Sequence, residues 1–298
     1  MSIDTAPPIV VTVVPRSPED AILAVLADIL SDVEKVRIAA ENRLRQFTRN
    51  EPDEDGEMRG FGLDEGHPAV ARLSALVQML VEAERVSVVS LEKAVKEHPL
   101  GPWVAKTKGI GAKQGGRLLA ALGDPYWHPL HNRPRLPSEL WSFAGYGVWR
   151  VDPGTHEIVP RDQGLPPGDL GIAPHRRKGH KSNWSDGAKM RTFLIAEACL
   201  KQLKAPCKNE DGTVTHKPGC ACSPYRLVYD AARAKYAESV HRTECKRCGP
   251  SGKPALVGSP LSPGHKHGRA MRLVSKEILL DLWLEGKRLH ESKGDVDA

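Results

Sequence analysis

The sequence contains no run of 18 apolar residues, so it has no segment long enough to cross a membrane as a helix. Residues 1–8 also lack the basic stretch and apolar core of a secretory signal peptide. We therefore expect a cytoplasmic protein without a membrane partner. In that compartment the six cysteines are more typical of reduced thiols or metal ligands than of disulfides.

Aromatic residues are scarce, at 5% of the chain, whereas 24 prolines and 27 glycines predict many loops. The chain has 298 residues, which is enough for one large domain or two ordinary domains with real cores. Apolar residues recur at helical spacing along much of the chain, so we expect a mostly α-helical fold.

Positive charge is scarce in the first third of the chain and abundant afterwards. Residues 1–100 hold 11 Lys and Arg against 18 Asp and Glu, a net charge of −7. The remaining 198 residues hold 32 against 19, a net charge of +13. Summed positive potential attracts polyanions whatever their base sequence, so this asymmetry indicates a polyanion partner for the second part of the chain. The expected polyanion is DNA, with structured RNA as an alternative. A basic surface that only keeps the protein soluble is the competing interpretation.

Residues 17–100 follow an apolar, β-branched tail at residues 1–16. Two amphipathic helices are expected at about residues 21–48 and 68–96, joined by an acidic loop at residues 50–66. This pattern predicts an antiparallel helical hairpin. Its apolar seam can pack on its own domain or join two copies of the chain as a homo-oligomer.

The segment 101–204 opens with a glycine turn, Gly109-Ile110-Gly111, between two helix-like stretches. Glycines around one apolar residue permit a tight turn and leave backbone amides uncovered where the next helix starts. Such an N-terminus favours phosphate, which predicts a helix-hairpin-helix that grips the nucleic-acid backbone without reading bases. An ordinary helix pair joined by a glycine turn is the alternative. The expected contact residues are Lys106, Lys108, Gly109, Gly111, Lys113 and Arg117.

A second basic run precedes Trp184 and a helix expected at residues 189–203. Basic residues beside an aromatic side chain favour phosphate contact, although a solvated loop is the alternative. The residues of this run are Arg176, Arg177, Lys178 and Lys181.

Residues 205–250 form a cysteine-rich insertion that predicts a small zinc site. Zinc needs four ligands at tetrahedral angles, which the pair Cys245-x2-Cys248 cannot supply alone. We expect the earlier cysteines to complete one closed, structural site, with His216 and His241 as stand-ins; reduced structural thiols and a redox pair are the alternatives. The expected ligands are Cys207, Cys220, Cys222, Cys245 and Cys248.

Two other features complete the expected fold. Cys199 lies in an apolar helical context and is expected in the core. Residues 251–298 predict a loop that continues to Gly268 and then a final helix at residues 269–290. The whole is thus expected to be a mostly α-helical chain, with a helical hairpin, a helix-hairpin-helix DNA-binding body and a small zinc-binding insertion.

Three passages together resemble the C-terminal half of transposases of the insertion-sequence-110 family. They are Gly109-Ile110-Gly111, the run Leu140-Trp141-Ser142-Phe143-Ala144-Gly145-Tyr146, and Arg177-Lys178-Gly179 leading into Lys189-Met190-Arg191-Thr192-Phe193-Leu194. The stretch Ala40-Glu41-Asn42-Arg43-Leu44 is also similar to the coiled coil that precedes the hairpin in that family. The resemblance covers roughly residues 35–290 and implies a transposase-like DNA-binding body.

Departures from the family pattern imply that this body lacks the chemistry. The family begins with a resolvase-like RNase H domain, for which there is no room before residue 17. It also uses a serine nucleophile in its C-terminal half, whereas residues 143–181 contain no serine and only one aliphatic hydroxyl, that of Thr155. We therefore expect DNA binding without strand cleavage. The rivals are an active recombinase that uses Ser182, Ser185 or a partner's acidic site, and an adaptor protein that binds through its acidic helices.

Overall fold

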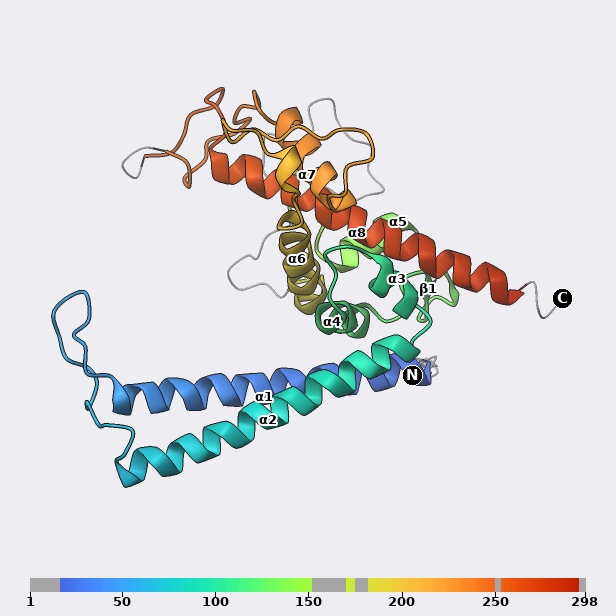
Figure 1. Ribbon diagram of the computed structural model, residues 1–298. Coiled ribbons are helices and arrows are strands. Elements are labelled where there is room, and N and C mark those ends of the chain that lie inside the picture. Colours follow the sequence, from blue (N-terminus) through green and yellow to red (C-terminus); the bar gives the residue numbers. More distant parts are fainter. Residues whose placement is uncertain (1–16, 152–169, 175–181, 250–252, 295–298) are drawn as a thin grey trace, which may run out of the picture.

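The computed structural model describes residues 17–151, 170–174, 182–249 and 253–294 (Figure 1). Within these ranges eight α-helices dominate, which confirms the expected mostly helical fold. None of the described helices is long and apolar enough to cross a membrane. The helices are α1 (Pro18–Thr48), α2 (Pro68–Glu97), α3 (Gly101–Lys106), α4 (Ala112–Leu122), α5 (Pro137–Phe143), α6 (Asp186–Leu200), α7 (Pro224–Lys235) and α8 (Pro263–Gly294).

The strands are short and form two antiparallel pairs in the described ranges. β1 (Trp127–His128) pairs with β2 (Arg133–Pro134), and β3 (Trp149–Val151) pairs with β4 (Leu170–Ile172). A single 3-10 turn, η1 (Ala205–Cys207), is also present there. Sheets of this size add little core, so packing between helices must hold the fold together.

Helices α1 and α2 lie side by side as an antiparallel arm, which confirms the expected helical hairpin (Figure 1). Each begins at a capped proline: the Ser17 hydroxyl accepts a hydrogen bond from the Asp20 amide at 3.1 Å, and His67 Nδ1 accepts one from the Ala69 amide at 3.2 Å. A side-chain acceptor satisfies an amide that has no partner within the helix, and proline is preorganised for the first turn.

The body of the protein is built on α4 and α8. Helix α4 packs against α1, α2 and α6, and α8 runs along the body in contact with α5, α6 and α7. The α8 side chains Ile278, Leu279 and Leu282 are completely buried in the same apolar cluster as Leu118 and Leu119 of α4. One continuous core therefore joins the arm, the glycine turn and the C-terminal helix.

Helix α8 begins earlier than the sequence predicts. A loop is expected to continue to Gly268, but the helix already starts at Pro263. The Ser262 hydroxyl accepts a hydrogen bond from the His265 amide at 3.3 Å and caps the new first turn. Capping and proline at the first position thus offset the cost of Gly264 and Gly268 inside the helix.

Helix α6 also starts before its expected position, at Asp186 rather than Lys189. The Ser185 hydroxyl accepts a hydrogen bond from the Ala188 amide at 3.2 Å, so this serine is an N-cap. The tail at residues 1–16, the basic residues Arg176, Arg177, Lys178 and Lys181, and Thr155 lie outside the described residues.

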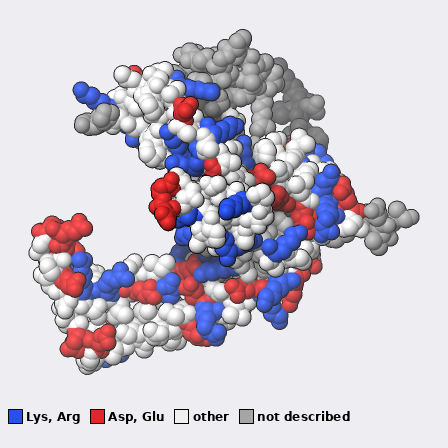
Figure 2. All heavy atoms as spheres, turned by 45° about the horizontal axis from the view of Figure 1, so that its top comes forward, with Lys and Arg blue, Asp and Glu red and all other residues white. Residues whose placement is uncertain are grey.

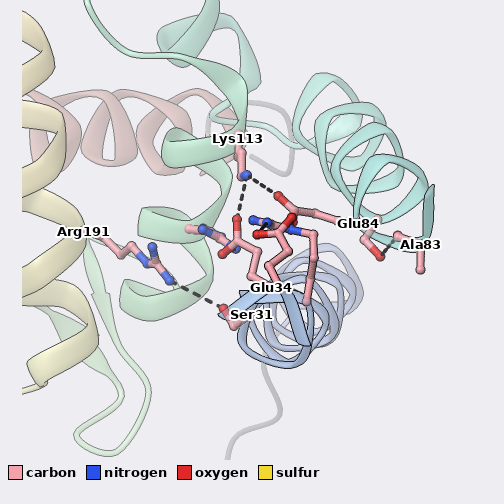
Figure 3. A network of polar contacts seen from close by, with 10 residues as sticks. Ser31, Glu34, Ala83, Glu84, Lys113 and Arg191 are labelled. Carbon is pink, nitrogen blue, oxygen red and sulfur yellow. Dashed lines mark hydrogen bonds and ion pairs between the residues drawn. The ribbon is translucent and has the colours of Figure 1, made fainter. Parts of the chain in front are cut away.

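Ion pairs fix α4 to the arm (Figure 3). Arg117 is only 4% exposed, and its guanidinium donates to the Glu34 carboxylate. Lys113 Nζ lies 2.7 Å from Glu34 Oε1 and 3.4 Å from Glu84 Oε1, so it bridges α1 and α2. Arg37 on α1 also donates to Glu84. Lys113, Arg117 and Arg37 thus each have a carboxylate partner, which is the condition for keeping charge away from water.

The pKa of Glu34 reports the balance of forces in this network. Burial disfavours the charged form, but hydrogen bonds from Arg117 and Lys113 outweigh burial and lower the pKa of Glu34. The unfolded chain has the higher pKa, about 4.3. The stabilisation is therefore complete above that pH and is lost as the pH falls through the folded-state pKa.

Substitution Glu34→Ala should lower the free energy of unfolding by about 2–3 kcal/mol near neutral pH, because it leaves the Arg117 guanidinium buried without its carboxylate. Urea titrations at several pH values measure this, and the difference from wild type should shrink as the pH falls below about 4.3. The control is Glu82→Ala, whose exposed ion pair with Arg85 should contribute less than about 1 kcal/mol. Equal effects of the two variants would refute a buried network.

Candidate metal centre and nucleic-acid interface

Four side chains with ligand atoms converge between η1 and the start of α7. Their ligand atoms all lie within 4.8 Å of one another. Cys207 Sγ is 3.1 Å from Cys220 Sγ and 3.7 Å from Cys222 Sγ, and His216 Nδ1 is 3.5 Å from Cys220 Sγ. These sulfur distances are too long for disulfides. Three sulfurs and one nitrogen form a usual tetrahedral zinc set, so this first cluster can hold a metal ion such as zinc.

The surroundings of the first cluster orient its ligands. His216 Nε2 lies 2.7 Å from Asp230 Oδ2, and the same oxygen accepts a hydrogen bond from Arg226 Nε at 2.7 Å. When Nε2 carries the proton, the lone pair of Nδ1 faces the sulfurs. A carboxylate behind a histidine ligand in this way fixes the ring and increases its basicity.

Backbone amides also point at the sulfurs of the first cluster. The Lys204 amide donates to Cys222 Sγ at 3.1 Å, and the Cys222 amide donates to Cys220 Sγ at 3.3 Å. Hydrogen bonds to a sulfur favour its charged form, which is the form that binds metal.

The thiols lie so close together that their pKa values differ from one another. Hydrogen bonding with Cys220, together with burial, raises the pKa of Cys207 to about 12. The same interaction lowers the pKa of Cys220. Three neighbouring sulfurs cannot all carry negative charge without a cation between them, so a bound metal must displace thiol protons. Metal affinity should consequently decrease as the pH falls.

The five expected cysteine ligands do not form the one site that the sequence predicts, but lie in two separate clusters. His216, named as a stand-in, occupies the fourth position beside Cys207, Cys220 and Cys222. Cys248 lies instead with His241 and His265 in a second cluster, which Cys245 adjoins. The sequence analysis missed His265, because it lies in a stretch expected to be loop. The available signal was Ser262-Pro263, a helix start 14 residues after Cys248 that places His265 in the first turn.

The glycine turn after α3 packs against the first cluster. Gly109 has a φ of 98°, and a Cβ atom there would lie 2.8 Å from Cys199 Sγ, so only glycine fits against α6. The Lys108 carbonyl accepts a hydrogen bond from the Ser223 hydroxyl at 3.0 Å, and its ammonium donates to the Ala221 carbonyl. The turn is thus anchored to the residues that directly follow the cysteine ligands.

Cys199 itself is completely buried in the apolar core, as expected. Burial raises the pKa of its thiol to about 11. A thiol that stays protonated in this way is inert toward metals and oxidants. Cys199 therefore serves packing against Gly109 and belongs to neither cluster.

The residues expected to contact phosphate around the turn divide into two groups. Lys106 is exposed on α3 and Gly111 is exposed at the start of α4. Lys113 and Arg117 point instead to the acidic side chains of the arm, so phosphate contact would require them to leave those ion pairs. Part of the predicted interface therefore holds the fold together.

Exposed cations gather instead on the segment that carries the cysteine ligands. This basic module (residues 201–253) holds 11 Lys and Arg against 5 Asp and Glu, a net charge of +6. The module lies in the part of the molecule above the arm (Figure 1). Figure 2 shows basic side chains on this part and around the hollow between it and the arm. Among the described residues, none of the module's nine exposed cations has an acidic partner within ion-pair distance. They are Lys201, Lys204, Lys208, Lys217, Lys235, Arg242, Lys246, Arg247 and Lys253.

No family model, curated protein or solved structure matches this chain.

Substitution Asp230→Asn should weaken metal binding at the first cluster about 10–100-fold, because the histidine ligand loses the carboxylate that orients it. Competition with a chromophoric chelator measures the affinity, which should also fall between pH 8 and pH 6 as protons compete for the thiolates. The control is Asp211→Asn, an exposed carboxylate in the same cysteine-rich segment. Identical affinities for the two variants would show that Asp230 does not support a bound metal.

Proposed function

We propose that the chain is a sequence-tolerant DNA-binding protein whose basic module contacts the phosphate backbone. The observation that carries this proposal is the set of nine exposed cations that have no acidic partner in the described part of the chain, on a module that a metal can hold rigid. Lys and Arg contacts to phosphate supply affinity and position but carry no base information. The metal is zinc, and it is structural, because four protein ligands leave no position open for a substrate.

The glycine turn contributes to the same surface in this proposal. Its Lys106 and the exposed start of α4 at Gly111 present charge and backbone amides to an anion, while Lys108 fastens the turn to the module. The resemblance to a transposase C-terminal half supports DNA as the polyanion. Of the two serines that could act as nucleophiles, Ser185 caps α6 and so has another role. We propose that the chain binds DNA without cleaving it.

The charge reversal Lys208→Glu with Lys217→Glu should weaken binding to unrelated duplexes alike, because both side chains belong to the basic module. The slope of log affinity against log salt should fall by about 2, one for each lost phosphate contact. Fluorescence anisotropy across a salt series measures both quantities, and labelled strands incubated with Mg²⁺ should remain uncut. The control, Lys35→Glu with Arg85→Glu, makes the same change in net charge on the arm and should alter the slope little.

Three results would contradict the proposal. Equal losses in both double variants would mean that total charge, not the module, governs affinity. Tighter binding to structured RNA than to duplex DNA would reassign the partner. A protein–DNA adduct that survives denaturation would establish catalysis.

We also propose that the arm joins two copies of the chain. Ile22, Val25, Ile29 and Val36 are exposed, and their spacing places them on one face of α1. Helix α2 likewise exposes large apolar side chains, which are Leu76, Met79, Val86 and Val89. An apolar stripe along a helix of 31 residues, about 46 Å, favours a partner helix of similar length, and a second copy provides one.

The double substitution Ile29→Glu with Val36→Glu should convert a dimer to a monomer, because two carboxylates cannot be buried at an apolar seam. Light scattering at several protein concentrations measures the mass. The control is Lys35→Glu, an exposed position on the same helix that should leave the mass unchanged. A wild-type protein that is monomeric throughout the range would refute self-association through the arm.

A further inference from the structure

A second group of ligand-type side chains lies where the chain enters α8, apart from the first cluster. Ligand atoms of His241, Cys248 and His265 lie within 4.8 Å of one another. Cys245 Sγ lies 3.9 Å from His265 Nε2, so it borders the same space. The rings of His241 and His265 meet edge to face, with centroids 5.3 Å apart. One thiol and two imidazoles thus converge, and the second thiol, that of Cys245, lies beside them.

His241 provides an independent sign that something is bound there. The side chain is only 4% exposed, yet its Nε2 atom has no hydrogen-bond partner among the described residues. Leaving a buried polar atom unsatisfied costs about 1–3 kcal/mol. Coordination to a metal would satisfy this nitrogen, and the neighbouring thiols are suitable co-ligands.

The backbone on one side of the group is arranged as a short antiparallel ladder. Cys245 and Ala255 exchange amide hydrogen bonds of 3.0 and 2.9 Å, and His241 accepts one from the Gly258 amide and donates one to the Ser259 carbonyl, both at 2.8 Å. On the other side, His265 is fixed in the first turn of α8 by the Ser262 cap. Secondary structure thus holds at least three of the four positions before any ion arrives.

We propose that Cys245, Cys248, His241 and His265 bind a second zinc ion in a closed Cys2His2 site. Two thiolates balance the charge of Zn²⁺, and two neutral imidazoles complete a tetrahedral shell. The two clusters share no ligand, so each can fill and empty independently. The second ion would join the ladder to the start of α8 and hold Arg242, Lys246 and Arg247 on the surface of the basic module.

The test is the zinc content of the full chain, measured by inductively coupled plasma mass spectrometry after dialysis. Wild type should hold about two zinc ions, on the count of ligands. Both His265→Ala and His216→Ala should hold about one, and the double variant none. The matched control is His267→Ala, two residues further along α8, where the ring meets the Tyr229 hydroxyl at 2.8 Å instead of the cluster. It should keep both ions.

Cobalt substitution keeps the proposal testable if His265→Ala fails to fold. His265→Cys replaces nitrogen by sulfur and should retain both metal ions, while its sulfur-to-cobalt absorption increases and its d–d bands shift. The control His267→Cys should give the same spectrum as wild type. An unaltered spectrum in His265→Cys would overturn the proposal.

The outcomes separate this site from the first cluster. One zinc in wild type that disappears in His216→Ala but survives in His265→Ala overturns the second site and leaves the first. One zinc in wild type that disappears in His265→Ala but survives in His216→Ala supports the second site and removes the first. A Cys245–Cys248 disulfide in protein purified without reductant, with only one zinc bound, would overturn the second site in favour of a redox pair.

Discussion

The ion pairs between α4 and the arm are the constraint on which the rest of this structure depends. Arg117 and Lys113 bring α4 against α1 and α2, while Gly115 allows the same helix to approach Val104 so closely that a Cβ atom would lie 2.6 Å from its side chain. The glycine turn before α4 contacts α6 at Cys199 and the cysteine segment at Ala221 and Ser223. Residues that resemble a phosphate-binding motif therefore serve first to assemble the protein.

Local sequence features predict most of the helices, because apolar spacing and caps act within a few residues. The arm is an example: Ser17-Pro18 starts α1, and the period of its apolar residues continues almost to Thr48. The partners of Arg117 are harder to predict. Its carboxylate, Glu34, lies 83 residues away in the sequence, and nothing in either local pattern indicates that they meet. The uneven charge of the two parts of the chain is thus partly neutralised inside the fold.

The cysteines show the same division between composition and geometry. Their number and the Cys-x2-Cys pair suggest metal, but which side chains form one ligand set depends on the three-dimensional structure. The chain has 12 histidines, and spacing alone does not select His216 or His265 from among them. His216 becomes a candidate ligand because Asp230 on α7 contacts its ring. His265 becomes one because α8 starts at Pro263, a start that the glycines of its first turns make hard to predict. The positions of both histidines thus depend on tertiary structure and capping, which outweigh local helix propensity.

The position of α8 has a consequence for biosynthesis. Its residues Ile278, Leu279 and Leu282 complete the core that Leu118 and Leu119 begin, so this core stays incomplete while the ribosome is still translating the segment between them. Contacts over such a separation form late and slowly. The nascent chain must therefore keep its apolar surfaces soluble until α8 emerges.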